Sequence, residues 1–294
     1  GLDLAGKVFL EPGDLVACEN PTYLAALTVF RSYECGLLPI ETDDDGMVPE
    51  DLERKLAANP KARLMYIIPS FQNPTGRTWS LERRRKILEI AQRYELPILE
   101  DNPYGELRYE GQTIPTLKSM DTTGVVTYMG SFSKVLSPGI RLGWMLTSRE
   151  LIEKYESAKE CADLQASTLT QMVVDTYLAH NDLDENIRRL NELYRGRRDK
   201  MLALLAAEFP EGSRWTHPCG GLFLWATLPE GIDTDALLPI TVAHKAAYIP
   251  GRAFFADGDE CRCLRLNFSN ASEAQMEQGI AIMGQVFRDA LAKG

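Results

Sequence analysis

The sequence predicts an α/β fold in which a mostly parallel sheet precedes a smaller α+β domain. Before Ser148, short apolar runs rich in branched and aromatic residues recur along the chain. They are continuous rather than alternating, as in strands covered on both faces. Helix-like segments separate them, which is the order expected of parallel strands joined by right-handed crossovers. From Trp215 onward the expected strands are short, which is typical of a separate, smaller domain.

The expected elements of the large sheet follow one another from the first residue. Residues 1–10 have the character of a helix, and Ser80 is suited to be an N-cap of the helix after it. The expected strands are 15–18, 36–40, 64–68, 97–99, 125–129 and 142–146, and the helices between them are 23–33, 49–58 and 81–94.

A long, mostly helical segment is expected to link the two domains. It spans residues 150–209, with charged residues on one face and apolar residues on the other. Short strands are expected at 222–225, 247–249 and 263–268, followed by a closing helix at 272–292. We therefore predict a large domain, residues 1–185, that includes the linking helix, and a small domain, residues 186–294. Because the chain starts without Met and within a helix, we expect the large domain to lack its N-terminal portion.

Composition narrows the class of protein. The 294 residues are 45% hydrophobic and 25% charged, as in an ordinary globular protein that can bury a core. The net charge of −10 argues against nucleic acid or anionic membrane as the main partner. No apolar run approaches the roughly 20 residues of a membrane-spanning helix, and the N-terminus lacks a basic segment followed by an apolar one. We expect a cytoplasmic protein with reduced cysteines, and, with three histidines outside any metal motif, no metal site.

Two motifs rich in turn-forming residues follow successive expected strands. Asn73-Pro74-Thr75-Gly76 comes after strand 64–68, and Asp101-Asn102-Pro103-Tyr104 comes after strand 97–99. Taken singly, the first could be a simple turn and the second a helix cap. However, an acidic residue at the end of a buried strand is costly unless a cation meets it, and a protonated ring nitrogen would serve.

Two cationic residues mark the end of the next strand and the start of the one after it. Lys134 lies in Ser131-Phe132-Ser133-Lys134, a turn of small residues where a partly desolvated amine loses its proton more easily, as imine chemistry requires. Arg141 lies between glycines at the start of an apolar strand, which suggests an anion held close to the backbone rather than a surface arginine.

These four motifs in this order make the chain resemble the fold-type I pyridoxal-phosphate (PLP) aminotransferases of class I and II. The likeness runs from Gly1 to the C-terminus and is closest to the group that acts on 2-aminoadipate, kynurenine, aromatic or branched-chain amino acids. It implies a seven-stranded, mostly parallel sheet in the large domain and a homodimer. It also implies transfer of an amino group from an amino acid to a 2-oxo acid, with 2-oxoglutarate as the expected acceptor.

The resemblance also assigns roles to the motif residues. Lys134 would hold the cofactor as a Schiff base and then move the proton of the substrate Cα, and Asp101 would keep the pyridine nitrogen protonated. Asn73 and Tyr104 would donate to the phenolic oxygen of the cofactor. The phosphate would be bound by Ser131, Ser133 and Arg141. Tyr23 would stack on the ring, although a lone tyrosine there could equally belong to the core.

Arg265 is the expected substrate-binding residue of the small domain. It stands in Leu264-Arg265-Leu266-Asn267-Phe268-Ser269, where a charged side chain is unusual unless it is paired. By the resemblance it would grip the substrate α-carboxylate with a bidentate fork, and Asn73 would also contact the substrate. Segments 220–225 and 248–255 resemble small-domain segments of the same family.

Several other functions are weighed against this one. Ser131-x-x-Lys134 also fits a serine acylase, but the S-D-N and K-T-G tripeptides of that class do not occur. A PLP-dependent lyase would use the same ring-binding residues, and Arg265 as a carboxylate clamp argues mildly for transamination. An aminotransferase-like effector domain of a transcription regulator is a further alternative. The basic run Arg83-Arg84-Arg85-Lys86 is short and more typical of a solvated helix face than of a recognition helix.

Overall fold

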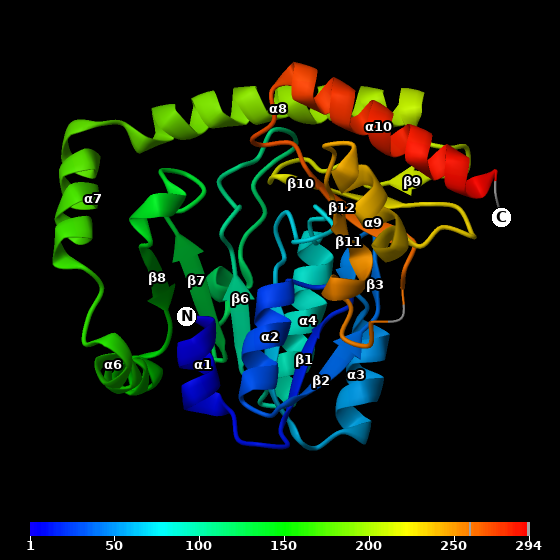
Figure 1. The fold of residues 1–294 in the computed structure, drawn as a ribbon. Helices are drawn as coiled ribbons and strands as arrows, with labels where there is room; N and C mark the ends of the chain where they lie inside the picture. Colours follow the sequence, from blue (N-terminus) through cyan, green and yellow to red (C-terminus); the bar gives the residue numbers. More distant parts are fainter. Residues whose placement is uncertain (259, 293–294) are drawn as a thin grey trace.

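A six-stranded sheet forms the centre of the large domain. The computed structural model describes residues 1–258 and 260–292 (Figure 1). In spatial order the strands are β2 (Gly36–Ile40), β1 (Leu15–Glu19), β5 (Ala62–Ile67), β6 (Ile98–Asp101), β7 (Val126–Ser131) and β8 (Gly143–Leu146). Neighbours are parallel except β7 and β8, which pair antiparallel. The predicted fold class is confirmed, with six strands in this sheet instead of the expected seven.

Helices cover both faces of this sheet, which explains the continuous apolar strands. Met65 and Ile67 of β5 pack in a cluster with α3 (Pro49–Ala58), α4 (Leu81–Arg93) and the short α5 (Leu117–Met120). Leu64 and Tyr66, which alternate with them, pack with α1 (Leu2–Phe9), α2 (Leu24–Ser32) and α6 (Arg149–Asp163). Because successive side chains of a strand point to opposite faces, a strand between two helical layers must be apolar at every position.

Three helices occupy the segment that was expected to be mostly helical. After α6 come α7 (Thr168–His180) and α8 (Leu183–Glu208), which starts at Asp182 as its N-cap. Leu164, with φ of +61°, ends α6, and no glycine or proline marks this break in the sequence. The predicted domain boundary at residues 185/186 falls near the start of α8, and the division itself remains a prediction.

The small domain is a four-stranded antiparallel sheet with helices on one side. Its strands lie in the order β11 (Ile249–Pro250), β12 (Cys263–Asn267), β10 (Phe223–Thr227) and β9 (Arg214–Trp215). The two-residue β9 was not predicted, and the strand expected at 247–249 overlaps β11 only at Ile249. Side by side at the top of Figure 1 lie α8 and α10 (Glu273–Leu291), which pack on one another and on the sheet. The remaining elements are α9 (Thr234–Ala243), the hairpin β3 (Thr42–Asp43) and β4 (Gly46–Met47), and the 3-10 turns η1 (Pro138–Ile140) and η2 (Gly251–Phe254).

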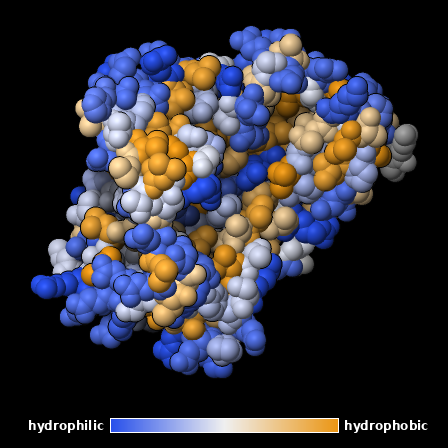
Figure 2. Space-filling view, turned by 60° about the vertical axis from the view of Figure 1, so that its left-hand side comes forward, coloured by the Kyte–Doolittle hydropathy of each residue, from blue (hydrophilic) through white to orange (hydrophobic). Residues whose placement is uncertain are grey.

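Strand alternation turns one face of the small sheet away from its helices. Leu224 and Leu266 pair across β10 and β12 and pack in the cluster that includes α8 and α10. Trp225 and Arg265 form the next pair and therefore point to the opposite face. Figure 2 shows one side of the molecule hollowed, with hydrophilic residues deep in the hollow and hydrophobic residues on its rim. Among the described residues, no helix combines the length and the hydrophobicity that crossing a bilayer requires.

Candidate active site

The predicted site residues of the large domain gather at one edge of the sheet. Asp101 is the last residue of β6 and Ser131 the last of β7, and Asn73 lies in the loop after β5. Because these three strands are parallel neighbours, their carboxyl ends meet at the same edge. Ligands of open α/β sheets bind at this edge.

Asp101 is a buried carboxyl group with a neighbouring phenol. The hydroxyl of Tyr66 donates to Asp101 Oδ2 at 2.8 Å. Burial raises the pKa of Asp101 to about 6, and the hydrogen bond from Tyr66 opposes this shift. The raised pKa shows that the surroundings stabilise the charge incompletely, so a cation placed against this carboxylate would be bound favourably.

Asn73 and Arg265 join the loop after β5 to strand β12. Arg265 Nη1 donates to Asn73 Oδ1 at 2.8 Å, and Asn73 is buried. The guanidinium of Arg265 lies 4.2 Å from the ring centroid of Phe223 and 5.0 Å from that of Phe254, so it contacts two aromatic side chains. Its Nε is buried and has no hydrogen-bond partner among the described residues. An arginine fixed in this way presents unused donors to an anion.

Tyr104 and Tyr23 belong to the same group. Burial raises the pKa of Tyr104 well above its usual value, the charge of Asp101 and the phenol of Tyr23 raise it further, and Arg265 and Asn73 oppose the shift. Tyr104 also packs edge-on against Phe223. Tyr23 stands at the N-cap position of α2. Burial lowers the pKa of Arg265, while Tyr104 and Tyr23 act in the opposite direction. Both phenols are therefore close enough to the Arg265 guanidinium to affect its pKa.

Lys134 lies in the turn after β7 and is half-buried. Burial lowers the pKa of its ammonium group, and the charges of Arg141 and Arg265 lower it further. A half-buried amine near positive charges loses its proton more easily than a surface lysine. It can therefore act as a nucleophile or as a base.

Ser131 and Ser133 lie at and just after the end of β7, and Arg141 lies just before β8, the neighbouring strand. The backbone N–H of Ser133 donates to Ser131 Oγ at 3.0 Å. Arg141 follows η1 in the left-handed region, with φ of +54°, and its Nη1 donates to the carbonyl of Pro138 at 3.2 Å. Hydroxyl and guanidinium groups at this edge can bind an oxyanion.

A cavity of about 1060 Å³ lies at this edge of the sheet. Asp101, Ser131 and Arg141 are among the residues that line it. The other six predicted site residues are not in its wall: Tyr23, Asn73, Tyr104, Ser133, Lys134 and Arg265. A buried carboxylate and oxyanion-binding groups in the wall of one cavity suit PLP, which carries a ring nitrogen and a phosphate. Among the described residues, no cluster of three or more metal-ligating side chains occurs.

Sequence reasoning missed two features of this site. Tyr66 lies within β5 and has the pattern of a core residue, so its hydroxyl contact with Asp101 has no local signal. The aromatic rings around Arg265 lie in segments that were noted only as similar to the family. Their contact with the guanidinium depends on how β10, η2 and β12 come together.

Comparisons with known proteins agree with this geometry. A family model described as aminotransferase class I and II matches residues 1–282. Aromatic-amino-acid aminotransferase 1 of Thermococcus litoralis is 44% identical over 296 residues, which cover 99% of this chain and 71% of that protein.

Two solved structures are also similar. The kynurenine aminotransferase of Pyrococcus horikoshii, solved with PMP, superposes with a TM-score of 0.95 at 42% identity, over 99% of this chain and 73% of that one. The alpha-aminoadipate aminotransferase LysN of Thermus thermophilus, complexed with N-(5'-phosphopyridoxyl)-L-leucine, superposes with a TM-score of 0.95 at 34% identity, over 100% of this chain and 76% of that one.

Proposed function

The chain belongs to the class I and II aminotransferases, and from this premise we propose that it moves the amino group of an aromatic, 2-aminoadipate-type or branched-chain amino acid to 2-oxoglutarate. The observation that carries the proposal is the placement of Arg265. Its guanidinium is fixed by Asn73 and two aromatic rings, and its charge lowers the pKa of Lys134. Arg265 is thus both a carboxylate-binding group and a charge that makes the amine of Lys134 more reactive.

The residues of the cavity would hold PLP. When bound, PLP supplies a carbonyl that reacts with amines and a conjugated ring that draws electrons from the substrate Cα. We propose that Asp101 accepts a hydrogen bond from the protonated ring nitrogen and that Ser131, Ser133 and Arg141 bind the phosphate. Tyr23 would cover the face of the ring.

The contact with Arg265 also orients Asn73. Because Asn73 Oδ1 accepts from Arg265, its amide Nδ2 is left to donate. We propose that this Nδ2 and the hydroxyl of Tyr104 both donate to the phenolic oxygen of the cofactor. The same asparagine would then position both the cofactor and the arginine that binds the substrate.

Lys134 would act twice in the reaction. It would hold the cofactor covalently, and its amine, when free, would accept the proton of the substrate Cα and act as the proton donor in the return transfer. The charges of Arg141 and Arg265 favour the neutral amine that this step needs. Because Arg265 would hold the α-carboxylate, the Cα–H bond remains the bond to break, which favours transamination over decarboxylation.

Two further features are proposed. A homodimer is expected from the resemblance, and a cytoplasmic location is proposed separately, from the sequence features weighed above. Sedimentation of the purified protein would test the first, and fractionation of the source cells the second.

The experiment that tests the function combines spectroscopy with turnover. Purified protein should absorb near the edge of the visible range, and borohydride followed by peptide mass spectrometry should locate the reduced cofactor on Lys134. Phenylalanine, 2-aminoadipate and leucine should each be offered with 2-oxoglutarate, and glutamate should form with at least one of them.

The variant Lys134→Ala should bind PLP without a covalent bond and lose amino transfer. Lys61→Ala, which changes an exposed lysine before β5, serves as the matched control and should behave like the parent. Unchanged turnover in Lys134→Ala would refute the assigned role. Bound PLP without glutamate formation from any donor would instead favour the effector-domain alternative, and release of another product would favour a lyase.

A further inference from the structure

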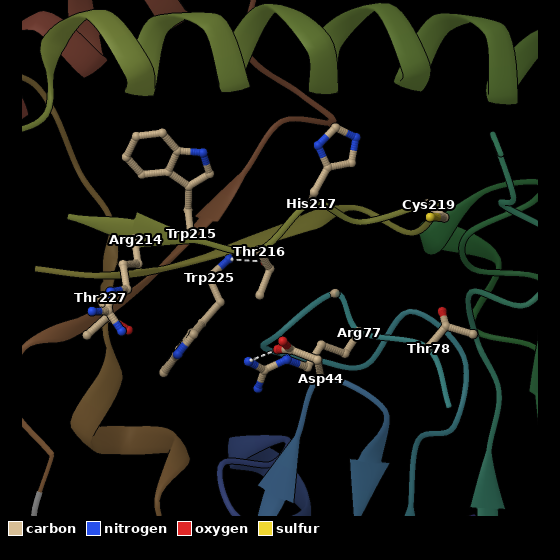
Figure 3. Close-up of a pocket in the computed structure, with 11 residues that line it drawn as sticks. Asp44, Arg77, Thr78, Arg214, Trp215, Thr216, His217, Cys219, Trp225 and Thr227 are labelled. Atoms are coloured by element: carbon tan, nitrogen blue, oxygen red, sulfur yellow. Dashed lines mark hydrogen bonds and ion pairs between the residues drawn. The ribbon is translucent and has the colours of Figure 1, made fainter. Parts of the chain in front are cut away.

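A second cavity, of about 670 Å³, lies between the large domain and the small sheet (Figure 3). One wall is the end of the loop after β5, with Gly76, Arg77 and Thr78, together with Asp44 of the turn between β3 and β4. The other wall is made by strands β9 and β10 and the segment between them. None of the nine predicted site residues lines this cavity. Its volume is within the range of small-molecule sites, roughly 300–1,000 Å³.

Strand register decides which side chains of the small sheet face this cavity. Arg214 pairs with Thr227 across β9 and β10, and Trp225 is two residues from Thr227 on the same face. Figure 3 shows these three on the side of the strands that faces Arg77 and Asp44, while Trp215 and His217 point away toward α8.

Two arginines on opposite walls have charges that the protein leaves largely unused. Arg77 Nη2 pairs with Asp44 Oδ1 at 2.7 Å, but the side chain of Asp44 is 96% exposed, so solvent weakens this pair. Arg77 Nε is buried and has no hydrogen-bond partner among the described residues. Arg214 is exposed and forms no ion pair with any residue of the described ranges. With Arg77, Arg214 and Asp44 in the wall, the charged side chains of this cavity carry a net charge of +1, in a chain whose net charge is −10.

Two threonines lie with these arginines in the wall of the cavity and add hydroxyl groups to a site for an anion. The hydroxyls of Thr78 and Thr216 line the cavity. Thr216 Oγ1 accepts from the backbone N–H of Trp225 at 3.1 Å, which orients this hydroxyl to donate elsewhere. Guanidinium groups bind carboxylates and phosphates through paired N–H donors, and two of them on facing walls suit an anion with two charges.

The walls of this cavity are continuous with those of the candidate active site. The loop after β5 contacts Arg265 through Asn73 and lines the second cavity with Gly76 and Arg77. On the other side, β10 contacts Arg265 through Phe223 and lines the second cavity with Trp225. A ligand that joined Arg77 to Arg214 would therefore hold together the two segments that position Arg265.

We propose that this cavity binds a small dianion, a dicarboxylate or a phosphate ester, which bridges Arg77 of the large domain and Arg214 of the small domain. By clamping the two domains, the bound anion changes the affinity of Arg265 for the substrate carboxylate, and the substrate changes the affinity for the anion by the same factor. Anion binding here does not depend on the reaction that the enzyme carries out.

Calorimetric titration of the holoenzyme with succinate and, separately, with inorganic phosphate tests the proposal. With PLP bound, the proposed phosphate site at Ser131 and Arg141 is filled, so added phosphate reports on the second cavity. Arg214→Gln and Arg77→Gln should each weaken binding of the effective probe roughly tenfold or more, because each removes charge-assisted hydrogen bonds. Arg85→Gln, which changes an exposed arginine on α4, should bind as the parent does. Binding of succinate alone identifies a dicarboxylate site, and binding of phosphate alone a phosphate site.

Three results would overturn the proposal. The first is the absence of binding with both probes, and the second is binding that neither Arg214→Gln nor Arg77→Gln weakens. The third is succinate binding that is lost in Arg265→Gln but kept in Arg214→Gln, which would place the probe in the candidate active site. Arg214 is exposed, so its replacement leaves the fold intact, and its result decides the matter if Arg77→Gln unfolds.

Discussion

The proposed carboxylate site makes a quantitative prediction for Arg265→Lys. Lysine keeps the positive charge but lacks the planar fork, so at least one charge-assisted hydrogen bond to the substrate is lost, worth about 1.5–3 kcal/mol. It also loses the position of the guanidinium at 4.2 Å from Phe223 and 5.0 Å from Phe254, worth about 0.5–1 kcal/mol. Together these give about 2–4 kcal/mol, which corresponds to a fall in kcat/KM of roughly 30- to 700-fold.

Steady-state kinetics with phenylalanine and 2-oxoglutarate would measure this effect. Both substrates carry the carboxylate that Arg265 is proposed to bind, so the KM values of donor and acceptor should rise together. Arg262→Lys is the matched control, because Arg262 precedes β12 and pairs with Glu260 outside the site. A fall in kcat/KM of less than threefold in Arg265→Lys, or a change confined to one substrate, would refute the reasoning.

Two further predictions concern stability. Burial raises the pKa of Glu19 to about 8 from an unfolded value of 4.5. Between these two pH values the native state holds a proton that the unfolded state releases. The free energy of unfolding should therefore fall as pH rises from about 4.5 to about 8, by at most about 5 kcal/mol. Urea unfolding midpoints should show this slope in the parent and a flatter one in Glu19→Gln, whatever its absolute stability; equal slopes would contradict the assignment. Gly76→Ala should lower the melting temperature more than Gly13→Ala. Both glycines have positive φ, so alanine strains the backbone at either position. In addition, a Cβ on Gly76 would lie 2.7 Å from the carbonyl oxygen of Phe223, whereas a Cβ on Gly13 would meet nothing within 4 Å. Equal losses in the two variants, measured by thermal unfolding, would show that Gly76 is not pressed against β10.

The limits of local information are clearest in the linking segment. Residues 150–209 have helical periodicity, and three helices do form there. The break at Leu164 requires a left-handed backbone that its own sequence does not signal. The short strand β9 is likewise absent from the sequence pattern, because two residues are too few to show a period.

The sequence by itself determined the fold class, the family and the positions of Asn73, Asp101, Lys134 and Arg141 at the ends of strands. These features are local: apolar runs report burial, and turn motifs report where each strand ends. Only the tertiary structure decided what those side chains contact. The bond between Asn73 and Arg265 joins residues 192 positions apart, and the bond from Tyr66 to Asp101 joins neighbouring strands. Arg77 and Arg214 likewise face one another across a cavity only because of how the two domains pack. Side-chain partners so far apart in the sequence are set by strand register and domain packing, which no local pattern encodes.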